Sequence, residues 1–225
     1  DGKGQAVVRD PGQVDAIWAT LGTDQAILEQ FVEFDCELSV VGARNSRGEF
    51  VHYGPFRNSH TNHILDITVC PSGLSKDVDE RAIEVARRVF ESLDVVGVLC
   101  VELFVTNDQR ILINEIAPRP HNSGHLTIDA HRTCQFEQQV RAICGLPLGD
   151  ARQHTAAAMA NILGDVWGDT EPRWQELLAC DVKLHLYGKA EARRGRKMGH
   201  VTALAHSISD ADSIVRAARD SLLNK

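Results

Sequence analysis

Two glutamates, Glu102 and Glu115, have the type and spacing that most clearly indicate chemistry in this chain. They lie in residues 101–117, where two apolar runs rich in β-branched side chains flank the turn-forming residues 107–109. The pattern predicts a β-hairpin that places both carboxylates on one face, roughly opposite each other. Such like-charged pairs destabilise a sheet, whereas carboxylates and phosphate oxygens together bind Mg²⁺. The alternative is a solvated sheet edge that carries two acids.

A polar loop, PRPHNSGH at residues 118–125, follows the predicted hairpin directly. It contains prolines and a glycine and can bury little apolar surface, so its polar groups remain available beside the two glutamates. Arg119 can bind an anion, and His121 and Asn122 can form hydrogen bonds to it. The alternative is a zinc pair of His121 and His125, which would require a helix across Pro120 and Gly124.

Two further segments contain groups that can bind phosphate. Residues 1–5, DGKGQ, combine two glycines, whose backbone amides can approach a phosphate, with the positive charge of Lys3. Residues 193–197, RRGRK, form the one dense basic cluster of an acidic chain, between two predicted strands. An ordinary flexible turn and a solvated loop are the respective alternatives.

An adenine site is a further interpretation, for residues 29–32 together with Glu37. A strand at a sheet edge can offer backbone groups to adenine, and a following acid can bind ribose hydroxyls. Any strand with surface acids would show the same pattern. His60 and His63 lie in a polar stretch, where surface positions are the alternative to contacts with a ligand.

The composition argues against several classes of protein. A chain of 225 residues, 43% of them hydrophobic, can bury one substantial core, with or without a smaller satellite domain. The net charge of −7 disfavours a nonspecific nucleic-acid binder, and we expect no membrane span and see no signal peptide. Six cysteines without a CxxC pair indicate buried thiols in a reducing compartment, and we expect the cytoplasm.

Hydrophobic periodicity predicts an α+β fold with a largely antiparallel sheet around the hairpin. Besides the hairpin, strands are predicted at residues 5–9, 26–32, 37–45, 49–53, 64–70, 156–163, 182–187 and 199–204. Helices are predicted at residues 11–22, 77–93, 127–144 and 210–223. Residues 54–63 are predicted to form a loop, and Ser209 to cap the last helix.

Taken together, these motifs resemble the ATP-grasp enzymes, and among them the N5-carboxyaminoimidazole ribonucleotide synthetases (PurK type) of purine biosynthesis. The strings PRPHNSGH and GRKMGH are specific to this branch, whereas the paired glutamates and the glycine loop are shared by ATP-grasp enzymes generally. The matching strings, in family order, are DGKGQ (1–5), EQFVEFDCELSVVGARN (29–45), NSHTNHIL (58–65), VELFV (101–105), INEIAPRPHNSGH (113–125), QFE (135–137), GLPLG (145–149), HLYGK (185–189) and GRKMGH (195–200).

The resemblance implies an ATP-grasp fold and a ligase that uses ATP, Mg²⁺ and bicarbonate to carboxylate 5-aminoimidazole ribonucleotide through carboxyphosphate. It implies a remnant of the small ATP-grasp lobe at residues 1–30, the large lobe at 31–149 and a C-terminal subdomain at 150–225. A homodimer is common in the family. The family's N-terminal nucleotide-fold domain would precede Asp1, so we expect a fragment that is inactive when isolated.

The resemblance also implies a role for individual residues. Those expected to close over the ATP phosphates are Gly2, Lys3, Gly4 and Gln5. Those expected at the adenosine are Glu29, Gln30, Phe31, Val32, Glu37 and His60. Glu102 and Glu115 would ligate Mg²⁺, with Asn114 beside them. The expected catalytic residues are Arg119, His121, Asn122 and Lys197. Those expected to bind bicarbonate, the intermediate or the ribonucleotide are Arg119, His121, Asn122, Ser123, Lys189, Arg196 and Lys197.

The chain departs from the family pattern at three positions. Arg194 replaces a common proline in the basic loop, Asp66 replaces a common arginine, and Cys134 replaces a common serine. Three other functions remain open: a different ATP-grasp carboxylase or ligase, a noncatalytic nucleotide-binding or dimerisation module, and a metallohydrolase that uses His121 and His125.

Overall fold

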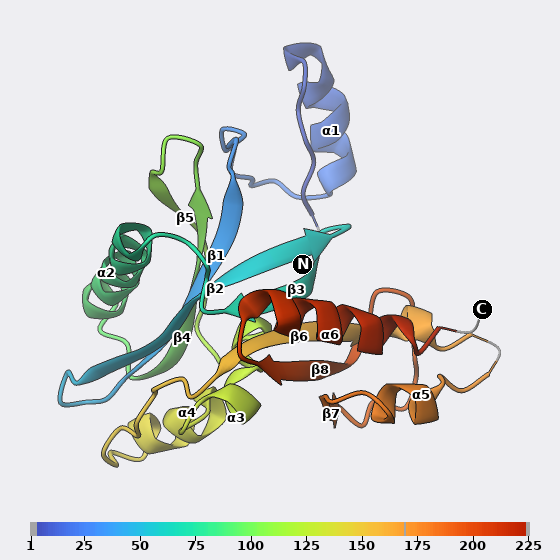
Figure 1. The fold of residues 1–225 in the computed structure, drawn as a ribbon. Helices are drawn as coiled ribbons and strands as arrows, with labels where there is room; N and C mark the ends of the chain where they lie inside the picture. Colours follow the sequence, from blue (N-terminus) through green and yellow to red (C-terminus); the bar gives the residue numbers. More distant parts are fainter. Residues whose placement is uncertain (1–3, 169, 224–225) are drawn as a thin grey trace.

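One antiparallel sheet of eight strands organises this α+β protein (Figure 1). The structure is a computed structural model that describes residues 4–168 and 170–223. The sheet order is β5-β4-β1-β2-β3-β6-β8-β7. The strands are β1 (Cys36–Arg44), β2 (Phe50–Thr61), β3 (Ile64–Cys70), β4 (Gly97–Val105), β5 (Ile111–Ala117), β6 (Ala156–Leu163), β7 (Lys183–Leu186) and β8 (Lys197–Ala205). Because β3 pairs with β6, the predicted 31–149 and 150–225 units share this sheet, and their division stays a prediction.

Two amphipathic helices, α2 (Lys76–Ser92) and α6 (Ile208–Asp220), cover one face of the sheet. The stripe of α2 that includes Val78, Ala82 and Phe90 is buried against β1 and β4. Burial of each large apolar side chain contributes roughly 1.5–3 kcal/mol to the free energy of folding. The packing of these two helices therefore stabilises the sheet on this face.

The opposite face combines apolar packing with a polar site, because side chains alternate along each strand. On β1, Leu38 and Val40 face α2, whereas Val41 belongs to the core on the other side, with Phe56 and Leu126. The short helices α3 (Thr127–Ala130) and α4 (Gln135–Ile143) lie beside one end of this face (Figure 1). The rest of the face carries the polar groups described below.

Residues 4–33 stand clear of the sheet (Figure 1), whereas the Phe34 ring stacks on Phe104 of β4 at 4.3 Å and the Asp35 N–H donates to the Val105 carbonyl. Residues 4–33 contain a 3₁₀ turn η1 (Pro11–Gln13) and the helix α1 (Val14–Leu21), neither of which has a buried residue. The strands predicted at residues 5–9 and 26–32 are wrong. Neither segment has a partner strand among the described residues, and an extended segment needs one to satisfy its backbone groups.

Three other predictions are wrong in ways that have local causes. The loop predicted at residues 54–63 is mostly strand β2, whose polar side chains face the site. The helix predicted at residues 127–144 is broken, because His131 forms a β-bridge with Gln153. The cap of α6 is Ser207, whose hydroxyl accepts from the Asp210 amide.

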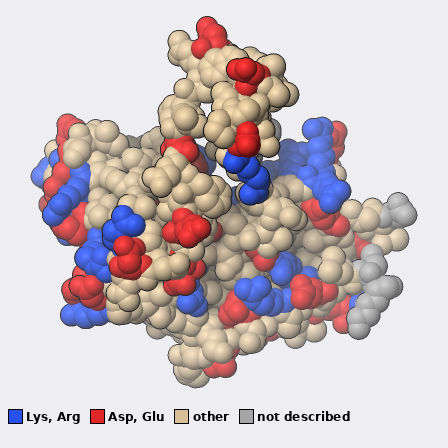
Figure 2. All heavy atoms as spheres, turned by 90° about the horizontal axis from the view of Figure 1, so that it is seen from above, with Lys and Arg blue, Asp and Glu red and all other residues tan. Residues whose placement is uncertain are grey.

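The remaining described elements are short. They are η2 (Asn122–Gly124), η3 (Gly164–Val166) and α5 (Trp174–Leu178). None of the described helices has both the length and the apolarity needed to cross a lipid bilayer. Basic and acidic side chains are interspersed over the face seen in Figure 2.

Candidate functional site

The two glutamates of the hairpin are register partners, as predicted: Glu102 on β4 pairs with Glu115 on β5. A bulge follows, in which Leu103 pairs with Ile113 and leaves Asn114 as the extra residue. Bulges bend a strand and re-aim its side chains. Glu102 is half-buried, whereas Glu115 and Asn114 are exposed. One carboxylate is therefore fixed by its surroundings and the other is open to a ligand.

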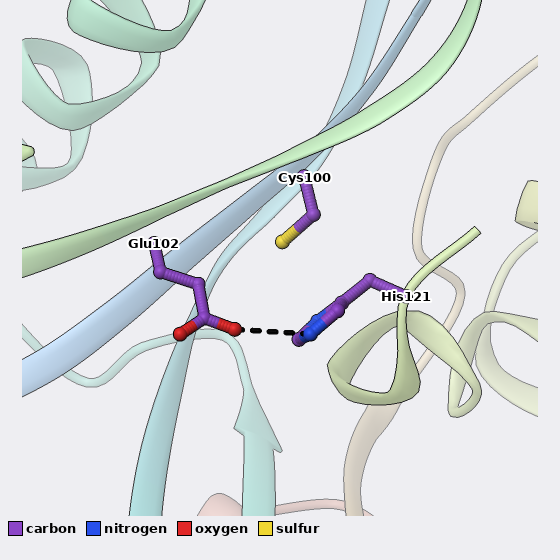
Figure 3. A group of neighbouring side chains, drawn as sticks. All are labelled: Cys100, Glu102 and His121. Carbon is purple, nitrogen blue, oxygen red and sulfur yellow. Dashed lines mark ion pairs between the residues drawn. The ribbon is translucent and has the colours of Figure 1, made fainter. Parts of the chain in front are cut away.

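His121 supplies a hydrogen-bond partner for Glu102 (Figure 3). The His121 Nε2 atom lies 3.0 Å from Glu102 Oε1, with side-chain exposures of 12% and 19%. Burial raises the pKa of Glu102, but the hydrogen bond and charge of His121, with smaller contributions from His60 and Lys197, lower it overall. Glu102 is consequently held in its anionic form, which is the form that binds cations.

The turn that carries His121 is held by Gln135 from α4. The Gln135 side chain accepts from the His121 backbone N–H at 2.9 Å and donates to the His121 carbonyl at 2.7 Å. Gly124 packs so closely that a Cβ there would lie 2.6 Å from Gln135 Oε1. The glycine of the PRPHNSGH string is therefore required for this packing.

A buried polar network continues from the turn into the sheet. The Ser39 hydroxyl bonds Ser123 Oγ at 2.8 Å and accepts from Asn58 Nδ2 at 2.9 Å. Separately, Asn122 exchanges two side-chain hydrogen bonds with Asn161, at 3.0 and 2.7 Å. Such satisfied buried networks rigidify a site.

Sequence reasoning missed most of this network. It singled out Asn122 and Ser123 but not the strand residues Ser39, Asn58 and Asn161. The available signal was a polar residue inside an apolar strand, such as Asn161 in AAAMANIL.

The basic loop between β7 and β8 reaches the acidic hairpin through Lys197. Burial lowers the pKa of Lys197, the charge of Glu102 opposes that shift, and Arg119 and Lys189 add to it. Lys189 Nζ donates to the Lys197 carbonyl. Arg196 instead donates to the Glu191 carbonyl at 2.9 Å, within the loop. The structure thus brings together Glu102, Arg119 and Lys197, which come from three distant segments.

A histidine cluster anchors the β7–β8 hairpin behind the turn. His185 Nε2 lies 2.8 Å from Asp129 Oδ2, and the His185 ring stacks on His200. Burial lowers the pKa of His125 to about 4 and that of His200 to about 3, so both imidazoles are neutral near neutral pH. Among the described residues, no group of candidate metal ligands contains both His121 and His125. The zinc pair considered for those two residues therefore has no support.

Two family models match this chain: an ATP-grasp domain over residues 1–136, and a phosphoribosylaminoimidazole carboxylase C-terminal domain over residues 157–213. The chain belongs to the ATP-grasp family. The first match contains the acidic hairpin and the His121 turn, and the second contains the basic loop. The predicted ATP-grasp fold is confirmed.

Individual ATP-grasp relatives agree with the resemblance seen in the sequence. The N5-carboxyaminoimidazole ribonucleotide synthase of Bacillus subtilis (strain 168) is 44% identical over 202 residues, which cover 90% of this chain and 53% of that protein. A crystal structure of an N5-carboxyaminoimidazole ribonucleotide synthetase in complex with ADP matches with a TM-score of 0.87 and 41% identity, over 97% of this chain and 57% of that one.

An Aspergillus clavatus N5-carboxyaminoimidazole synthase in complex with ADP and 5-aminoimidazole ribonucleotide matches with a TM-score of 0.82 and 29% identity. That match covers 92% of this chain and 57% of the Aspergillus chain. The chain therefore spans little more than half the length of these ATP-grasp relatives.

The residues expected at the nucleotide of an ATP-grasp enzyme are only partly assembled. On the sheet, His60 Nδ1 lies 2.5 Å from Glu37 Oε2, so these two are together. In the separate segment, Gly4, Gln5, Glu29, Gln30 and Phe31 are exposed and Val32 is half-buried. Gly2 and Lys3 lie outside the described residues.

Asp66, one of the departures from the ATP-grasp pattern, has a structural partner. Its carboxylate forms an ion pair with Arg219 of α6. Asp66 is also the extra residue of a bulge, because His60 pairs with Leu65 and Ser59 with Ile67. This acid therefore links the sheet to α6, and its charge is balanced within the chain by Arg219.

Proposed function

We propose that this chain provides the nucleotide, metal and acyl-phosphate site of a ligase that carboxylates 5-aminoimidazole ribonucleotide with bicarbonate. ATP is consumed, and the products are N5-carboxyaminoimidazole ribonucleotide, ADP and phosphate. The observation that carries the proposal is the convergence of Glu102, His121 and Lys197, because phosphoryl transfer needs metal carboxylates and cationic groups in one place. The names of the relatives support this choice of substrate.

The donor set fits Mg²⁺, a cation that relatives of this family are expected to use. Two carboxylates at paired positions across β4 and β5 repel each other, and Glu102 is kept ionised. We propose that Glu102 and Glu115 hold the metal, with Asn114 beside them; when bound, Mg²⁺ neutralises phosphate charge. Glu37 and His60 would bind the ribose side.

The N-terminal segment, whose residues 4–33 stand apart from the sheet, is proposed to cover the nucleotide. Gly2, Lys3, Gly4 and Gln5 would lie over the phosphates, and Glu29, Gln30, Phe31 and Val32 beside adenine. Phe31 is 76% exposed, so it offers an aromatic surface that packing within the described chain does not use. Closure over the nucleotide would exclude water from the labile carboxyphosphate.

The acceptor side is proposed to lie between the turn and the basic loop. Arg119 and Lys197 would bind the bicarbonate and phosphate charges, and His121, Asn122 and Ser123 would orient the reacting groups through fixed hydrogen bonds. Lys189 and Arg196 would hold the phosphate of the ribonucleotide. Burial lowers the pKa of Lys197, so this side chain would also be able to donate a proton.

We further propose three properties of the parent protein. A division into units 1–30, 31–149 and 150–225 would follow the two family matches in outline. A cytoplasmic location is supported by six free cysteines. A homodimer is supported by apolar side chains exposed on and just after α4, namely Phe136, Val140, Ile143 and Leu146. Sedimentation velocity and cell fractionation test the last two properties.

The activity is tested on the protein that contains this chain, by phosphate release and by mass spectrometry of the product. ATP consumption should require both bicarbonate and 5-aminoimidazole ribonucleotide. Lys197→Met should reduce kcat/KM at least about a hundredfold, whereas Lys183→Met, an exposed lysine of β7, should not. ATP consumption that needs a different amine, or none, would overturn the proposed substrate.

A further inference from the structure

A thiol lies beside the Glu102–His121 pair. Cys100 and Glu102 are two residues apart on β4 and so share one face of the strand, and His121 approaches both from the turn (Figure 3). One ligand atom from each of the three lies within 4.8 Å of the other two. Sulfur, nitrogen and carboxylate oxygen are the donors found in protein zinc sites.

The side-chain hydrogen-bond partners of the Cys100 thiol are the hydroxyls of Ser123 and Ser39, and hydrogen bonds of a thiol are weak. Cys100 is fully buried, and the contact of its Sγ atom with Ser123 Oγ is long, at 4.0 Å. On the other side of the imidazole, His121 Nδ1 lies 2.9 Å from Ser123 Oγ. Nδ1 also accepts from the Ser123 backbone N–H at 3.4 Å. With a metal on Nε2, the ring proton would move to Nδ1, which would give up that bond and donate to Ser123 Oγ. Metal-bound histidines commonly have such an outer partner.

We propose that Cys100, Glu102 and His121 bind a thiophilic divalent cation of the Zn²⁺ type. Metal bonds are about 2.3 Å to sulfur and 2.0 Å to nitrogen or oxygen, so tetrahedral ligand atoms lie about 3.5 Å apart. Modest side-chain rotations would bring the triad to that spacing. A thiolate, a carboxylate and a neutral imidazole together carry two negative charges and so match a divalent ion. Mg²⁺ prefers oxygen ligands and would not use the sulfur.

Binding exchanges a proton for the metal. Burial raises the pKa of the Cys100 thiol, with a further contribution from Glu102, so the metal-free cysteine is protonated. On binding, the S–H bond breaks, the S–metal bond forms, and the proton passes to the buffer. The hydrogen bond between Glu102 and His121 breaks, and the Glu102 carboxylate and His121 Nε2 both become ligands of the metal. No electron is transferred, and no co-reactant is needed.

The test uses Co²⁺ and then Zn²⁺ as probes on the 225-residue chain with Cys144→Ser, which removes an exposed thiol. A thiolate-to-Co²⁺ charge-transfer band should saturate at one Co²⁺ per chain and disappear on addition of Zn²⁺. Cys100→Ser should abolish the band and weaken Zn²⁺ binding by more than the roughly tenfold loss expected for an outer partner. Cys70→Ser, the matched buried control on β3, should keep both.

Absence of the charge-transfer band in the Cys144→Ser chain, or its survival when Cys100→Ser is added, would overturn the proposal. His121→Ala and Glu102→Gln, each checked for folding by circular dichroism, provide second variants and should weaken Zn²⁺ binding as well. Unchanged Zn²⁺ affinity in both would also overturn it.

The consequence for catalysis rests on the proposed function, since the cation would take Glu102 away from Mg²⁺. Mg²⁺ with a nonhydrolysable ATP analogue should therefore raise the apparent Zn²⁺ dissociation constant. Zn²⁺ binding without such competition would contradict the shared use of Glu102. Conversely, Mg²⁺-dependent nucleotide binding in a chain that shows no Co²⁺ band would contradict only the thiol site.

Discussion

The sheet with its polar turn and the segment at residues 4–33 are organised in opposite ways. On the sheet, the groups near Glu102 are fixed by buried hydrogen bonds from Gln135 and Ser39. In the separate segment, α1 has no buried residue, and Ile27 and Leu28 are almost fully exposed. The difference indicates that the groups proposed to bind the metal and the acyl phosphate are preorganised, whereas the segment proposed to cover the nucleotide is not held by packing on the sheet.

The largest expected difference between the two regions is in stability. Phe90→Ala, in the buried stripe of α2, should lower the free energy of unfolding by about 3–5 kcal/mol. Trp18→Ala, on α1, should change it by less than about 0.5 kcal/mol. Denaturant titration followed by circular dichroism measures both. Equal losses would show that the segment packs on the sheet after all.

A second, smaller effect distinguishes a loss of stability from a change in the geometry of the turn that carries His121. Gln135→Ala and Gln138→Ala each remove a buried amide with two backbone partners, and each should cost about 1–3 kcal/mol. Only Gln135 contacts His121, so only that variant should shift the imidazole resonances of His121 in NMR spectra. If Gln138→Ala moved these resonances equally, the turn would not be held in the way described.

The pH dependence of stability should come from the sheet region, because residues 1–35 contain no histidine. Burial lowers the pKa of His131 from 6.5 to about 4. The unfolded chain therefore binds a proton that the folded chain does not, and the contribution is complete above pH 6.5 and is lost as the pH falls toward 4. His131 should contribute about 1–2 kcal/mol of the loss between pH 7 and 5, and His125 and His200, whose pKa values are also lowered, should contribute further. His131→Phe should remove its share and make this slope shallower, and the exposed control His206→Phe should leave it unchanged.

The smallest effect concerns the ion pair of Asp66 and Arg219, which joins the sheet to α6. A double-mutant cycle with Asp66→Ala and Arg219→Ala should give a coupling free energy of about 1 kcal/mol, because the pair is only partly buried. Thermal unfolding of the four proteins measures it. A coupling near zero would mean that Asp66 is merely tolerated at this bulge.

The central hairpin was predictable because its signal is local: alternating apolar residues, a short turn, and two acids at matching distances from it. The register of Glu102 with Glu115 is confirmed. The first part of β2 was predicted as a strand at residues 49–53, but residues 54–61 were not, because Asn58 and His60 face a polar site and give this part of the strand the composition of a loop. The supporting Ser39 and Asn161 are identified only by long-range contacts, which a single sequence does not specify.

The central claim is that Glu102 and Glu115 bind Mg²⁺ together with a nucleotide. The most direct test is calorimetric titration of a nonhydrolysable ATP analogue into the chain, with Mg²⁺ or with EDTA. Mg²⁺ should tighten binding at least about tenfold, and the double variant Glu102→Gln/Glu115→Gln should lose that gain. The exposed control Glu91→Gln should keep it. Nucleotide binding that is indifferent to Mg²⁺, or a gain that survives in the double variant, would contradict the account.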